Sequence, residues 1–132
     1  MPDKRTLERA ARDRRQGKAA STQAGEFVRE EIEHVREGKH GARSTKQAIA
    51  IGLSKARRAG VKLRPPLKGT TSKQTRRRAK RDYARGQRGS TARPSPRRSR
   101  ATLGALKKEG RGAASRRALS RQAKQAARRR AA

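Results

Sequence analysis

The fold is decided by residues 21–63, which read STQAGEFVREEIEHVREGKHGARSTKQAIAIGLSKARRAGVKL. This stretch holds most of the large apolar side chains of the chain, namely Phe27, Val28, Ile32, Val35, Ile49, Ile51, Leu53, Val61 and Leu63. They recur three or four residues apart in two runs, which is the spacing of one buried helix face. The stretch therefore predicts two amphipathic helices.

The ends of both helices are marked in the sequence. The first is predicted over residues 21–37, with Gly38 as its left-handed stop. The second, over residues 45–59, begins at a capping box in which Ser44 and Gln47 satisfy free amides reciprocally. Because the link between the helices is short, we expect them to pack as a helical hairpin.

The two predicted helices carry opposite charges. Residues 26–37 include five Glu against two Arg, whereas residues 45–59 include four basic side chains and no acidic one. Pairing should place the acidic helix beside the basic one. We expect Glu30, Glu31 and Glu33 on a solvent-exposed face, where no apolar pocket separates their pKa values for acid–base catalysis.

The rest of the chain has little to bury. Only 14 of the 132 residues are Leu, Val, Ile or Phe, and 40 basic side chains against 10 acidic ones give a net charge of +30. Highly charged chains with less than roughly 20% of these apolar residues are mostly disordered. The expected fold is mainly α, a small helical hairpin with weak flanking helices and a long disordered basic C-terminal arm.

Three regions are predicted on this basis: a basic N-terminal helix or arm over residues 1–20, the hairpin over 21–63 and the basic arm over 64–132. The N-terminal helix should run from Asp3 to near Gly17 and fray.

Within the arm, transient helices are predicted near residues 72–85 and 113–131. The first would open at a capping box from Thr71 to Gln74. Residues 86–100 are read as linker or disorder and residues 101–109 as a short turn.

Catalytic and metal sites are not expected. The chain has no cysteine, so it has no disulfide, zinc ribbon or thiol nucleophile. His34 and His40 are six residues apart and should not share a face, so we predict no metal site, no cofactor and no enzymatic activity. No apolar segment resembles a membrane span or a secretory signal, which favours a cytoplasmic protein with no membrane partner.

The basic residues predict nucleic-acid binding. Arginine accounts for 28 of the 40 basic side chains, and its planar fork binds phosphate oxygens bidentately. Because only Phe27 and Tyr83 are aromatic, duplex backbone recognition is favoured over base stacking. The candidate binding residues are Lys46, Lys55, Arg57, Arg58, Arg76, Arg77, Arg78, Lys80, Arg81, Arg97, Arg98, Arg116, Arg117, Arg128, Arg129 and Arg130.

Residues 21–63 also resemble a family of small basic bacterial proteins that carry a domain of unknown function and are often labelled DNA-binding or plasmid-stabilisation proteins. The resemblance continues into TSKQTRRRAKRDYARGQ at residues 71–87 and ALSRQAKQAARRR at residues 118–130. It implies a bacterial cytoplasmic protein and transfers no catalytic residue.

The main functional hypothesis is a non-enzymatic, largely sequence-independent DNA-binding protein of the nucleoid, acting through phosphate neutralisation by the Arg-rich arm. One alternative is a structured-RNA or ribosome-associated binding protein, since basic arms suit either duplex. Another is a protein-interaction module that docks a basic partner on the acidic helix 26–37.

Overall fold

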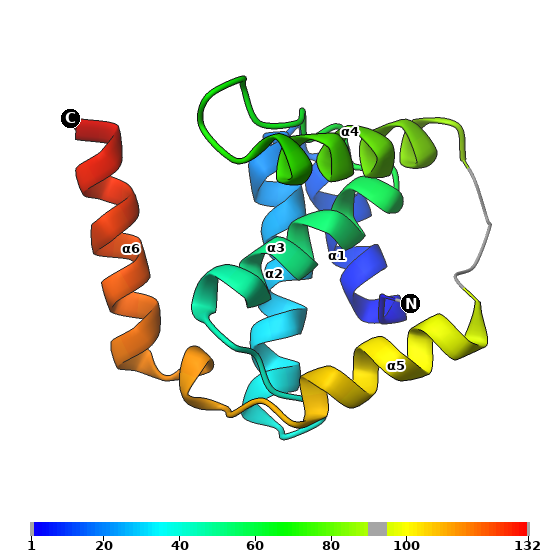
Figure 1. Cartoon of the computed structure of the whole chain (residues 1–132). Helices are drawn as coiled ribbons and strands as arrows, with labels where there is room; N and C mark the ends of the chain where they lie inside the picture. The colour runs from blue at the N-terminus through cyan, green and yellow to red at the C-terminus, as the bar shows by residue number, and fades with distance from the viewer. Residues whose placement is uncertain (1, 90–94, 132) are drawn as a thin grey trace. The chain divides into compact units, whose positions relative to one another are not determined.

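The computed structural model describes residues 2–89 and 95–131. Within these ranges the chain is helical, with no strand, which confirms the mainly α prediction (Figure 1). The elements are α1 (Lys4–Arg15), α2 (Ala20–Arg36), α3 (Thr45–Arg58), α4 (Lys73–Gln87), α5 (Pro96–Lys107), the short 3-10 helix η1 (Gly112–Ala114) and α6 (Arg116–Ala131).

The chain packs as two compact units, and both are discontinuous in sequence. Of the described residues, the first unit contains 2–30 and 51–89, and the second contains 31–50 and 95–131. Helices α2 and α3 each contribute residues to both units.

The core of the first unit is built from one aromatic and several small side chains. Phe27 is 1% exposed, and Ala24 and Ala56 are fully buried beside Ala10 and Val61. Small side chains allow the helices to approach closely. The number of large apolar residues therefore underestimates the apolar surface that this unit can bury.

The predicted hairpin helices do pack against each other. A Cβ atom added to Gly52 of α3 would lie 2.6 Å from the Cα atom of Val28 in α2, so the contact requires glycine. The predicted helix ends are also confirmed. Gly38 and Gly60 have φ angles of +78° and +98°.

The capping box predicted at the start of α3 is formed on the Ser44 side only. The amide of Gln47 donates to Oγ of Ser44 at 3.2 Å, and Oε1 of Gln47 accepts from the amide of Arg43 at 2.6 Å. The side chain of Gln47 therefore reaches one residue further back than the Ser44 amide that an ideal box would use.

Helix α1 is integrated into the first unit through Glu30 of α2. The Glu30 carboxylate, in a residue that is 3% exposed, accepts hydrogen bonds from the amide of Asp3 and the hydroxyl of Thr6. Its other oxygen lies 3.7 Å from Nζ of Lys55 in α3. The acidic and basic helices are thus adjacent, as their charges predicted.

Helix α4 differs from its prediction at both ends. Its N-cap is Ser72, whose hydroxyl accepts from the amide of Thr75, and this replaces the box predicted from Thr71 to Gln74. The helix continues to Gln87 because Gly86 is helical and packs closely, since a Cβ atom there would lie 1.8 Å from the carbonyl oxygen of Arg57.

The prediction of a disordered C-terminal arm is wrong. Ser95 caps α5 by accepting from the amide of Arg98, and Ser115 caps α6 by accepting from the amide of Ala118. Alanine and arginine are strong helix formers, and with these caps they form helices despite the positive charge.

The turn predicted at residues 101–109 is therefore part of a helix up to Lys107. Of the predicted linker over residues 86–100, residues 90–94 lie outside the described residues, and residues 96–100 form the first turns of α5.

The second unit is held together by backbone contacts to the loop between α2 and α3. The amide of Gly41 donates to the carbonyl of Leu106 at 2.8 Å, and the amide of Ala42 donates to the carbonyl of Gly110 at 3.0 Å. Farther along, the hydroxyl of Thr45 donates to the carbonyl of Ala113 at 2.6 Å. These contacts position the segment that leads into α6.

Candidate nucleic-acid interface and buried histidine cluster

Most of the basic residues singled out in the sequence are exposed. The exposed ones are Lys46, Arg58, Arg77, Arg78, Lys80, Arg81, Arg97, Arg98, Arg116, Arg117, Arg128, Arg129 and Arg130. Arg76 is partly buried, and its Nε donates to the carbonyl of Pro66 at 3.3 Å. The exposed residues of α6 form the most uniform basic surface, because this helix contains seven basic side chains and no acidic one.

Two of the candidates, Arg57 and Lys55, are buried or partly buried and make contacts within the first unit. Arg57 is 7% exposed, and its guanidinium donates to the carbonyls of Leu63 at 3.1 Å and Arg64 at 3.3 Å. Burial lowers the pKa of Arg57, and the carboxylate of Asp82 acts in the opposite direction. The side chain of Lys55 is 18% exposed and faces the Glu30 carboxylate.

Three arginines converge on a hollow in the second unit that sequence reasoning missed. The hollow, of about 330 Å³, is lined by Arg36, Arg111 and Arg116 together with Ala114 and Ser115. Nε of Arg36 donates to the carbonyl of Ala114 at 3.0 Å, which fixes its guanidinium at the rim. Because Arg36 and Arg111 are 75 residues apart, no sequence motif signals this convergence.

A second arginine-lined hollow lies on α1, in the first unit. Arg5, Arg9, Arg12 and Arg15 line it, together with Glu8. Their spacing of four, three and three residues places them on one helix face, and this pattern was readable in the sequence. The carboxylate of Glu8 makes this hollow less favourable for an anion than the one beside α6.

The acidic helix does not present the exposed face predicted for it. Glu30 and Glu31 are 3% and 1% exposed, and of the three carboxylates named in the sequence only Glu33 is exposed. Both carboxylates turn inward because each contacts side chains of its own unit. Glu30 contacts Thr6 and Lys55, and Glu31 contacts the two histidines.

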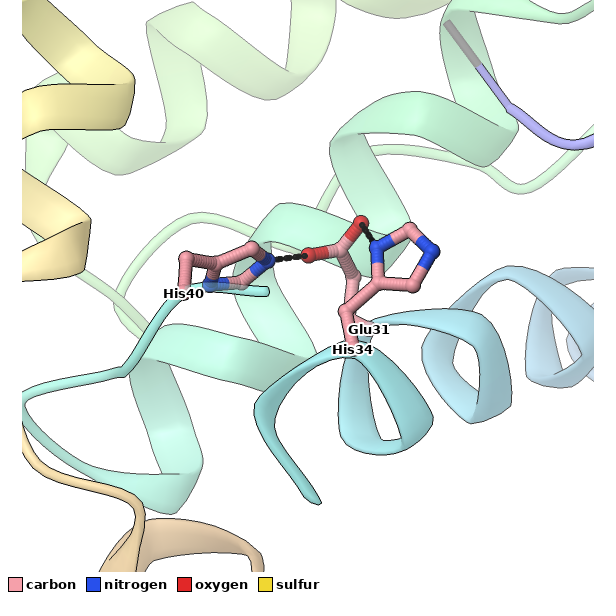
Figure 2. A group of neighbouring side chains, drawn as sticks. All are labelled: Glu31, His34 and His40. Atoms are coloured by element: carbon pink, nitrogen blue, oxygen red, sulfur yellow. Dashed lines mark ion pairs between the residues drawn. The ribbon is translucent and has the colours of Figure 1, made fainter. Parts of the chain in front are cut away.

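The partners of Glu31 are the two histidines (Figure 2). Its Oε2 lies 3.2 Å from Nε2 of His40, and its Oε1 lies 3.9 Å from Nδ1 of His34. The two imidazole rings are 5.8 Å apart at an interplanar angle of 84°. Figure 2 shows the carboxylate between the two rings.

The expectation that His34 and His40 lie apart is therefore wrong. Gly38 reverses the chain after α2, and the amide of Lys39 donates to the carbonyl of His34 at 3.0 Å. This tight turn brings His40 back over the last turn of α2, which periodicity along a single helix could not predict.

These features define a small, strongly basic helical protein with an arginine-lined hollow and a buried cluster of ionisable side chains. The chain belongs to a family of unknown function (DUF6496), which matches residues 3–68. The matched region covers α1, α2 and α3 and ends before α4.

Searches of curated proteins and of solved structures gave no significant match. The family match therefore covers the first three helices and assigns no ligand. In the part of the chain that the structure describes, no helix combines the length and the apolar character needed to cross a membrane.

Proposed function

We propose that the protein is a non-enzymatic binder of duplex nucleic acid that contacts the phosphate backbone with little dependence on base sequence, and that DNA is its preferred duplex. Such binding would place it on the nucleoid of a bacterial cell. The observation that carries the proposal is the convergence of Arg36, Arg111 and Arg116 on one hollow at the start of α6.

The hollow has the chemistry of a phosphate site. An arginine carries five N–H donors in a planar fork, so a guanidinium that already bonds a carbonyl, as that of Arg36 does, retains donors for an anion. No acidic side chain lines this hollow. The residues come from separate segments, so the site exists only in the folded second unit.

Helix α6 extends this positive surface. All of its seven basic side chains are exposed. Each phosphate that such a side chain neutralises releases condensed counterions, which makes binding steeply salt-dependent. The helix presents no aromatic side chain, so the expected contacts are with the backbone and not with stacked bases.

The test is a salt titration of binding to equal-length duplex DNA, duplex RNA and single-stranded DNA by fluorescence anisotropy. The test variant is R116Q/R117Q/R121Q at the start of α6, and the matched control is R5Q/R9Q/R12Q on α1, which removes the same charge. Loss of three phosphate contacts should lower the slope of log K against log salt by about 2.7 for DNA. The control should lower it by much less.

Equal effects of both variants would show that net charge alone determines binding, which would refute the role of the hollow and α6. A preference for duplex RNA would replace DNA by structured RNA as the partner. A flat salt response of the unmodified protein would overturn the proposal as a whole.

A further inference from the structure

We propose that Glu31, His34 and His40 form a binding site for a divalent transition-metal ion, with Zn²⁺ as the ion that fits best. This inference is independent of nucleic-acid binding. It rests on the position of three ligand-type side chains around one point, on the tautomer of His40 and on the burial of the cluster.

The distances suit a single ion. Each of the three residues offers a ligand atom, and these atoms all lie within 4.8 Å of one another. Bonds of about 2.0–2.1 Å in tetrahedral geometry place neighbouring ligand atoms about 3.3 Å apart. The contact between Glu31 and His40 already has this length, at 3.2 Å. The contact between Glu31 and His34 is longer, at 3.9 Å, and uses the other carboxylate oxygen, so the side chains of Glu31 and His34 must turn to close around one ion.

The tautomer of His40 leaves its Nε2 able to bind a metal ion. Its Nδ1 lies 2.8 Å from the carbonyl oxygen of Gly41, which can only accept, so Nδ1 carries a proton and donates it. In a neutral ring, Nε2 then presents a lone pair to Oε2 of Glu31, and two acceptors face each other. A metal ion between the two atoms would bond to both lone pairs.

The same hydrogen bond is typical of metal sites. Histidine ligands almost always donate their other ring N–H to a carbonyl or carboxylate, which fixes the ring and its tautomer. Here the backbone of Gly41 has this role for His40.

Burial strengthens the argument. Glu31 is 1% exposed and His40 is 8% exposed. A buried carboxylate needs compensating partners, and a divalent ion bound together with the two imidazoles would supply positive charge and directional bonds.

Two imidazoles and one carboxylate match the ligand preferences of Zn²⁺ and related ions, whereas Ca²⁺ and Mg²⁺ prefer oxygen ligands alone. A tetrahedral Zn²⁺ would take its fourth ligand from water.

The position of the site suggests what the ion would do. His40 precedes Gly41 and Ala42, whose amides donate to Leu106 at the end of α5 and to Gly110 just after it. An ion bound to His40 and to α2 would fix this loop against the helix. We infer a structural role in which the ion stabilises the second unit.

The test is isothermal titration of the full chain with Zn²⁺ and absorption spectroscopy with Co²⁺, both without nucleic acid. The expected result is one ion per chain and visible Co²⁺ bands of a four-coordinate site. The variants E31Q, H34Q and H40Q should each weaken binding at least about 10–100-fold, because losing a ligand costs no less than losing the group that orients one. E33Q removes an exposed carboxylate from the same helix and should bind as the unmodified protein does.

Absence of stoichiometric Zn²⁺ binding would overturn the proposal. Unchanged affinity in a ligand variant that circular dichroism shows to be folded would do the same. If E31Q and H40Q do not fold, H34Q decides, because the side chain of His34 is 14% exposed and tolerates substitution better. Since these titrations contain no nucleic acid, their failure leaves the proposed function untouched.

Discussion

Replacing Gly41 by alanine should destabilise the second unit selectively. A Cβ atom at this position would lie 1.9 Å from the carbonyl oxygen of Glu109 and 2.7 Å from that of Gly110. Both are backbone atoms, so they cannot rotate away as a side chain could. The segment must shift, and the hydrogen bonds from Gly41 to Leu106 and from Ala42 to Gly110 are lost or weakened.

The magnitude follows from these two bonds. Each contributes about 0.5–1.5 kcal/mol, so the expected loss is about 1–3 kcal/mol. For a unit of roughly 60–100 residues, 1 kcal/mol corresponds to about 4–8 °C in melting temperature. A loss near the middle of the range would lower the transition by roughly 8–16 °C.

Thermal melting followed by circular dichroism measures this change, and hydrogen exchange of the Gly41 and Ala42 amides locates it. The matched control is G104A, because Gly104 lies inside α5 and no atom lies within 4 Å of an added Cβ. There the higher helix propensity of alanine should stabilise by up to about 1 kcal/mol. If G41A melts at the temperature of the unmodified protein with both amides still protected, the described contact between loop and segment does not exist.

Three further changes test the first unit. E30Q should destabilise it by about 1–3 kcal/mol in urea unfolding, because the buried carboxylate loses its charge, whereas E33Q should have little effect. G86A should lower the melting temperature although alanine favours helix, because its Cβ would meet the Arg57 carbonyl at 1.8 Å; a higher melting temperature would contradict this packing. S72A should cost about 1 kcal/mol through loss of the α4 cap, measured by the same unfolding titration, and an unchanged midpoint would show that the cap does not form.

Local signals predicted the first half of the fold, because helix ends are determined by neighbouring residues. Gly38, Gly60 and the Ser44 to Gln47 box all act where the sequence placed them. Helices near residues 72–85 and 113–131 were predicted only as transient parts of a disordered arm, and α5 was not predicted at all, because only large apolar residues were counted. Fully buried alanines such as Ala24 and Ala56 supply core that this count leaves out.

The candidate sites depend on contacts that no local pattern contains. The arginine hollow joins Arg36 to a segment 75 residues away. The histidine cluster depends on the turn after α2, which folds His40 back onto Glu31. The 3.6-residue period of a helix predicts on which face of α2 His34 lies. It cannot predict that the loop after α2 brings His40 to the same face.

The discontinuity of the two units has a consequence for synthesis on the ribosome. Residues 31–50 emerge early, but the residues of α5 and α6 that complete their unit emerge much later. During that interval the amides of Gly41 and Ala42 have no Leu106 or Gly110 carbonyl to bond, whereas the first unit can close once α4 has left the exit tunnel. The nascent chain therefore matures in a fixed order, and a stalled or truncated product would carry a completed first unit beside an exposed, unfinished loop.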